Sequence, residues 1–180
     1  EIRLGAAPDL CPLIGKKECI VLPWKADTAW NSDDADEILL LPGNEFDRLT
    51  DSSKEKLNQQ YYIVTNQSDR MGYQLKGEPL SLHTNEEVVS SGVNFGTVQL
   101  LPGGQLIVLM ADHQTTGGFP RVAHVITSDH SKLAQIKPGD SIRFKFTDLP
   151  TAENLLIKQQ QHLLQLQNAC IFRLQEFIKK

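Results

Sequence analysis

The sequence has 180 residues, of which 40% are hydrophobic, and a formal net charge of -4. This length suits one domain with a full core, and the acidic balance provides no basic surface to attract nucleic-acid phosphates or anionic lipids. No stretch approaches the roughly 20 apolar residues that span a bilayer, and no secretory signal opens the chain, so we expect a cytoplasmic protein without nucleic-acid or membrane partners.

The cysteines and histidines predict neither a disulfide framework nor a metal site. Cys11, Cys19 and Cys170 are odd in number and lack the paired spacing of zinc ligands. The histidines are scattered and form no recognisable ligand motif. We therefore expect no metal and no cofactor bound by this chain.

Residues 1–36 are predicted to form a connector. They contain Pro8, Pro12 and Pro23 and show no sustained hydrophobic period. The chain starts without methionine, and residues 2–5 resemble the end of a strand already under way. We expect an N-terminal half to precede this segment in a longer protein.

Residues 37–148 are predicted to form a mainly β domain. A helix over residues 51–57 with Asp51 as its cap, and a brief one over 128–134 capped by Ser128 or Asp129, interrupt the strands. The expected strands cover residues 37–41, 61–65, 96–101, 105–110, 122–127 and 141–146. Short strands without repeated helix–strand alternation favour a closed, cyclophilin-like β-barrel from about Ile38 to Phe146 over a doubly wound sheet.

Residues 149–180 are predicted to form one long amphipathic helix, with glutamines 159–161 opposite an apolar stripe. Leucines and other apolar residues recur along it at spacings of three, four and seven. We expect this stripe to be buried against the barrel or a partner subunit, because propensity alone does not hold so long a helix. The stripe consists of Leu156, Leu163, Leu166, Cys170, Leu174 and Phe177.

A polar, glycine-bearing loop over residues 112–120, called the central loop below, joins the strands 105–110 and 122–127. Gly117 and Gly118 permit positive φ or the close approach of another group to their amides. One interpretation is a hairpin turn whose polar side chains satisfy local backbone donors. The other is a binding or catalytic loop.

Two further polar residues outside the central loop are candidates. Arg70 lies in a turn, where its planar guanidinium suits a carboxylate or phosphate, or forms an ion pair with Asp69 or another loop. Gln99 lies inside a strand, so its amide either faces solvent or has partners.

Three blocks of sequence carry a resemblance to a known family. They are residues 68–72 with Leu75 and Gly77, residues 92–96 with Gln99, and residues 112–120 followed by 134–135 and 138–140. These blocks resemble the C-terminal half of the biotin-dependent carboxyltransferase-like family, which includes allophanate hydrolase subunit 2 and the C-type subunit of 5-oxoprolinase. The resemblance extends from about residue 41 to 146.

The resemblance implies an enzyme subunit of the hydrolase class. It would act with a homologous B-type partner and a third 5-oxoprolinase subunit in the ATP-dependent hydrolysis of 5-oxoproline to glutamate, and this fragment alone would be inactive. The complex, not this chain, would bind ATP, and the substrate would be a small carboxylate or lactam. Alternatives are a regulatory module that relieves inhibition of a sporulation-type histidine kinase, and the carboxyltransferase domain of a urea carboxylase, in which case biotin would take part.

The resemblance also implies roles for nine residues. We expect seven of them to converge on one concave surface: Arg70, Gln99, Asp112, His113, Gln114, Thr115 and Thr116. Hydroxyls, amides and an arginine would stabilise charge on a carbonyl or carboxylate oxygen, and Asp112 or His113 would handle protons. The implied catalytic residues are Asp112, His113, Thr115 and Thr116. The implied substrate-binding residues are Arg70, Gln99, Gln114, Gly117 and Gly118.

Overall fold

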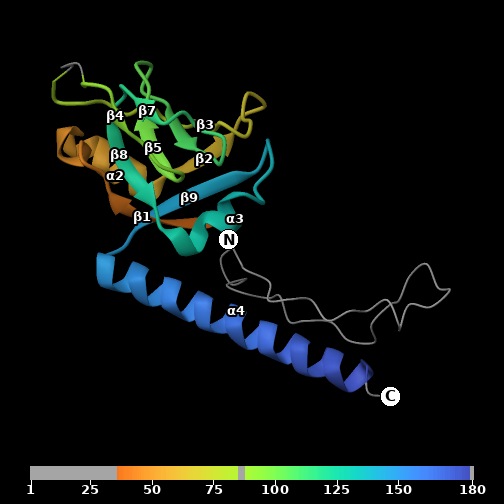
Figure 1. Cartoon of the computed structure of the whole chain (residues 1–180). Coiled ribbons are helices and arrows are strands. Elements are labelled where there is room, and N and C mark those ends of the chain that lie inside the picture. Colours follow the sequence, from red (N-terminus) through yellow and green to blue (C-terminus); the bar gives the residue numbers. More distant parts are fainter. Residues whose placement is uncertain (1–35, 85–87, 179–180) are drawn as a thin grey trace. The chain divides into compact units, whose positions relative to one another are not determined.

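The structure, a computed structural model, describes residues 36–84 and 88–178. The described residues divide into two units, one that ends at Gln159 and one that starts at Gln160. The first contains the β-sheets shown in Figure 1, and the division falls within helix α4 (Leu149–Ile178). The expected connector, with Cys11 and Cys19, lies outside the described residues apart from Asp36.

Seven strands of the described chain close into a barrel, in the order β1-β8-β5-β6-β3-β2-β9 (Figure 1). β1 runs parallel to β9, and the other neighbours in the barrel are antiparallel. The predicted mainly β barrel is confirmed, although β3 was not foreseen from the sequence. The strands are β1 (Glu37–Pro42), β2 (Tyr61–Val64), β3 (Gly72–Lys76), β5 (Thr97–Leu100), β6 (Leu106–Leu109), β8 (Arg121–Val125) and β9 (Ser141–Phe146).

The alternation predicted for β9 places its apolar side chains inside the barrel. Ile142 and Phe144 are buried, and the Phe144 ring lies 5.3 Å from the ring of buried Tyr62. On the other face, Arg143 and Lys145 both form ion pairs with Glu37 of β1, at 2.7 and 3.1 Å. The parallel pairing that closes the barrel is therefore supported by apolar packing inside and by charge outside.

Two short helical regions differ in detail from the prediction. α2 (Asp51–Gln59) is capped by Thr50, whose hydroxyl accepts from the Ser53 amide at 3.3 Å, so the prediction of Asp51 as the cap was wrong. The predicted brief helix divides into η2 (Thr127–Asp129) and α3 (His130–Leu133). A further short 3-10 helix, η1 (Phe46–Arg48), lies between β1 and α2. Asp129 makes no capping bond, because its carboxylate accepts the Leu39 amide of β1 at 2.9 Å.

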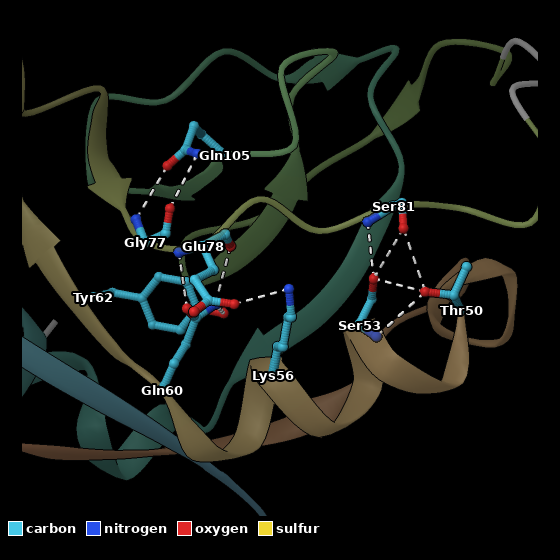
Figure 2. A network of polar contacts seen from close by, with 9 residues as sticks. All are labelled: Thr50, Ser53, Lys56, Gln60, Tyr62, Gly77, Glu78, Ser81 and Gln105. Carbon is cyan, nitrogen blue, oxygen red and sulfur yellow. Dashed lines mark hydrogen bonds and ion pairs between the residues drawn. The ribbon is translucent and has the colours of Figure 1, made fainter.

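A polar network fastens the segment after β3 to its neighbours (Figure 2). The Gln105 amide group bonds to both the N–H and the carbonyl of Gly77, at 3.1 and 3.2 Å. The Gln60 amide group does the same for Glu78, at 2.8 and 3.1 Å, and also donates to the Tyr62 hydroxyl at 2.7 Å. The two glutamine side chains thus supply the hydrogen bonds that a neighbouring strand would otherwise provide.

The predicted apolar stripe of α4 is only partly covered within this chain. Leu163 is 49% exposed and Cys170 is also exposed, whereas Leu156, Leu166 and Leu174 are half-buried. Burial of the whole stripe against the barrel is therefore wrong, and burial against a partner subunit stays a prediction. Within the barrel unit the helix instead packs through buried Ala152, and Gln159 from its polar face donates to the Ser128 carbonyl at 3.0 Å. In the described chain, no helix combines the length and apolar character needed to cross a bilayer.

Candidate functional site

The central loop crosses the end of a strand instead of closing a hairpin. It joins β6 to β8, and both of these strands pair with β5, which lies between them. The hairpin interpretation is therefore wrong. The Met110 amide donates to the Met71 carbonyl at 3.0 Å, and the Asp112 amide donates to the Arg70 carbonyl at 2.9 Å. These bonds fix the start of the loop against the turn that contains Arg70.

A two-stranded sheet holds the second half of the loop. β7 (Thr116–Gly117) pairs antiparallel with β4 (Ser91–Gly92). The ladder continues beyond the strands, because the Val93 amide donates to the Thr115 carbonyl at 3.1 Å. The block 92–96 and the central loop, which the family resemblance singled out separately, are thus bonded to each other through their backbones.

Gly117 lies directly against the buried side chain of Gln99. A Cβ added at Gly117 would lie 2.5 Å from Nε2 of Gln99, which is only 1% exposed. That nitrogen donates a long bond of 3.4 Å to the Phe119 carbonyl of the loop. Neither Gly117 nor Gly118 has positive φ, so Gly117 is required for close approach and not for an unusual backbone conformation.

Arg70 pairs with the central loop, not with its neighbour Asp69. Its Nε lies 2.9 Å from Oδ2 of Asp112, and its Nη2 lies 3.2 Å from Oδ1. Asp69 instead accepts the amides of Met71 and Gly72, at 2.8 and 3.1 Å. Because the Arg70 side chain is 82% exposed, its pair with Asp112 is weak and can exchange for a ligand carboxylate at low cost.

The side chains at the tip of the loop are accessible. Asp112, Gln114, Thr115 and Thr116 are exposed. His113 is half-buried, and its Nδ1 lies 2.6 Å from the Gln114 carbonyl. A carbonyl oxygen only accepts, so Nδ1 carries the proton and Nε2 is the basic nitrogen of the neutral ring.

The nine residues implied by the family resemblance therefore divide into an outer and an inner group. The outer group consists of Arg70, Asp112, His113, Gln114, Thr115, Thr116 and Gly118. Gln99 lies beneath the loop, and the buried Gly117 is the loop residue that faces it. Gln99 is placed to position the loop and is not exposed to a ligand. Convergence of the outer group on a concave surface remains a prediction.

A half-buried ion pair beside the site was not foreseen from the sequence. Arg121 binds Glu45 through Nε and Nη2, at 3.0 and 2.8 Å, and its backbone amide also donates to Glu45 at 2.8 Å. Arg121 Nη1 reaches the Gly92 carbonyl of β4 at 3.4 Å. The hydrogen bonds that Arg121 donates to the Glu45 carboxylate lower the pKa of Glu45 and raise the pKa of Arg121. The local sequence around either residue gives no signal of the pair, because the two residues are 76 positions apart in the chain.

Comparison with known proteins places the chain in a family. A family model described as carboxyltransferase domain, subdomain A and B, matches residues 10–146. The chain belongs to this family. It is 39% identical over 131 residues to a Haemophilus influenzae protein named as the C-type subunit of 5-oxoprolinase, and 40% identical over 129 residues to an Escherichia coli protein of the same name. The matches cover 73% and 72% of this chain, so the predicted resemblance is confirmed.

The chain spans about 42% of the length of these two relatives. Among solved structures, that of Kluyveromyces lactis urea carboxylase superposes with a TM-score of 0.68 at 20% identity, over 72% of this chain and 12% of that protein. This likeness concerns the fold. In the described residues, no group of three or more His, Cys, Asp or Glu side chains is arranged to hold a metal ion.

Proposed function

We propose that this chain is the C-terminal part of a protein like the C-type subunit of 5-oxoprolinase, which acts with partner subunits in the ATP-dependent hydrolysis of 5-oxoproline to glutamate. The proposal rests on the 39–40% identity to two proteins that carry this name. The name implies a role within a hydrolase of several subunits. Because the chain covers less than half of either relative, activity is expected only in the longer protein with its partners.

The outer group of the central loop has the chemistry that opening a lactam requires. The substrate carries a carboxylate. The exposed Arg70 guanidinium would bind this carboxylate when its ion pair with Asp112 opens. Attack on the lactam carbonyl moves negative charge onto its oxygen, which the Thr115 and Thr116 hydroxyls and the loop amides would stabilise. His113 Nε2 is available to accept a proton.

The test is 5-oxoproline-dependent ATP hydrolysis by the full-length protein reconstituted with its partner subunits. Arg70→Ala and Thr116→Ala are each expected to lower turnover by about 10²-fold, the lower end of the loss on removing one oxyanion-stabilising donor. Lys76→Ala is the matched control, since Lys76 is an exposed cation at the end of β3 outside the central loop. A loss below about threefold for both site variants would show that the loop is structural. ATP hydrolysis independent of 5-oxoproline would contradict the proposed reaction itself.

A further inference from the structure

A pocket of about 550 Å³ opens in the barrel unit and shares no residue with the central loop. It lies between the ends of β1 and β8, residues 94–95 and the first turns of α4. This volume is in the range of small-molecule sites in proteins. Its polar lining consists of Asn94, His124, Thr127, His130 and Glu153.

The two histidines of this pocket are held in place by their surroundings. The His130 ring stacks on Phe95 with 4.2 Å between ring centroids, and its Nε2 lies 3.3 Å from the Val125 carbonyl. Gly96, at φ 83°, leaves the room for this ring, because a Cβ there would lie 2.7 Å from Nε2. A larger residue at position 96 would therefore displace His130.

These contacts determine what the imidazoles can offer a ligand. Because the Val125 carbonyl only accepts, His130 Nε2 carries the proton and Nδ1 presents a lone pair. His124 uses Nδ1 to contact the Thr97 hydroxyl at 3.3 Å, which leaves Nε2 for a ligand. Burial lowers the pKa of both histidines, so both rings are neutral at pH 7.

The fixed charges favour a cation over an anion. Glu153, an exposed residue of the first turns of α4, is the lining residue that carries a formal charge, because the two histidines are neutral. The start of α4, which would otherwise attract an anion, is capped by Asp148, whose carboxylate accepts the Thr151 amide at 2.7 Å. Arg121, the cation that acts on His124, is neutralised by its half-buried pair with Glu45.

We propose that this pocket is a second ligand site, specific for a small planar cation of the amidinium or guanidinium type carried on an apolar body. The ligand N–H groups would donate to the Glu153 carboxylate and to Nδ1 of His130. The apolar body would pack on Phe95, Leu149 and Leu156, which line the same pocket. The site is independent of the reaction proposed for the central loop.

Benzamidine, benzamide and benzoate test this assignment, because they share one ring and differ in charge. Their dissociation constants are measured by NMR titration of the chain, following the ring signals of His124 and His130. Benzamidine is expected to shift both sets of signals saturably and to bind at least about threefold more tightly than benzamide, with benzoate weakest. Equal binding of benzoate and benzamidine would overturn the proposal, as would the absence of a saturable shift with any probe.

Two variants separate this site from non-specific binding. Glu153→Gln is expected to abolish the preference for benzamidine over benzamide, whereas Glu55→Gln, a matched change on the exposed face of α2, leaves it intact. Leu149→Trp, at a side chain that is 57% exposed, fills the pocket mouth without disturbing the core and is expected to weaken all three probes. An unchanged preference in Glu153→Gln would refute the role of the carboxylate.

Discussion

Replacing Gly117 with alanine tests whether the central loop is seated on the buried Gln99 amide. The added Cβ would lie 2.5 Å from Gln99 Nε2 and 3.3 Å from a methyl carbon of Val93. Gln99 is 1% exposed, so its amide has no solvent to move into. Overpacking of this kind costs about 1–3 kcal/mol, and loss of the bond to the Phe119 carbonyl adds about 1 kcal/mol. We expect the free energy of unfolding to fall by roughly 2–4 kcal/mol.

Urea denaturation of four proteins measures this coupling: the parent chain, Gly117→Ala, Gln99→Ala and the double variant. Once Gln99 is shortened to alanine, the Cβ at position 117 has space. In that background, Gly117→Ala is therefore expected to lower the free energy of unfolding by less than about 0.5 kcal/mol. Gly118→Ala is the control, because its Cβ would meet only the Ser90 hydroxyl at 3.2 Å and the Val88 carbonyl at 3.7 Å, with no contact as close as that at Gly117. If Gly117→Ala lowers the free energy of unfolding equally with and without the Gln99 side chain, the loop is not seated on that side chain and the reasoning fails.

The remaining predictions concern the Glu45–Arg121 pair and the hydrogen bonds of buried Tyr62. Because Arg121 lowers the pKa of Glu45, the pair stabilises the fold above the unfolded pKa near 4.5, and this contribution is lost as pH falls through the folded pKa. The free energy of unfolding of Glu45→Gln at pH 7 should therefore be lower by about 1–3 kcal/mol, and the difference should shrink in acid. Burial raises the pKa of Tyr62 to about 12, so a spectrophotometric titration should show a late-ionising tyrosine that is missing from Tyr62→Phe. The contribution of the neutral Tyr62 hydroxyl to the free energy of unfolding is present below pH 10 and declines as pH rises towards 12. The same decline in Tyr62→Phe would show that Tyr62 is not its source. Gln60→Ala should cost about 1–3 kcal/mol in urea denaturation, since it leaves Glu78 and the Tyr62 hydroxyl without that partner.

The barrel could be predicted from the sequence because its signals are local. Alternation of Ile142 and Phe144 with Arg143 and Lys145 identifies a strand with one buried face, and the structure has that face inside. Turn residues such as Pro102 and Gly103 mark the hairpin between β5 and β6. Each of these signals depends on a few adjacent residues.

Features that depend on distant partners were missed or misjudged. Glu45 and Arg121 are 76 residues apart in the chain, and neither has a neighbour that announces a half-buried pair. The hairpin interpretation failed because strand order in a barrel is not encoded in the two strands that a loop joins. Burial of the whole α4 stripe against the barrel was misjudged for a related reason: periodicity shows that Leu163 lies on an apolar face but not which surface covers it.

Closure of the barrel by β1 and β9 has a consequence for how the chain folds during synthesis. β1 has one neighbour in β8 and its other in β9, which is the last strand of the barrel to leave the ribosome. Until β9 emerges, β1 and β2 each present an unpaired edge that can recruit another nascent chain. A chain that ends before Ser141 would keep both edges permanently, so truncation there is expected to yield aggregates and not a smaller folded domain.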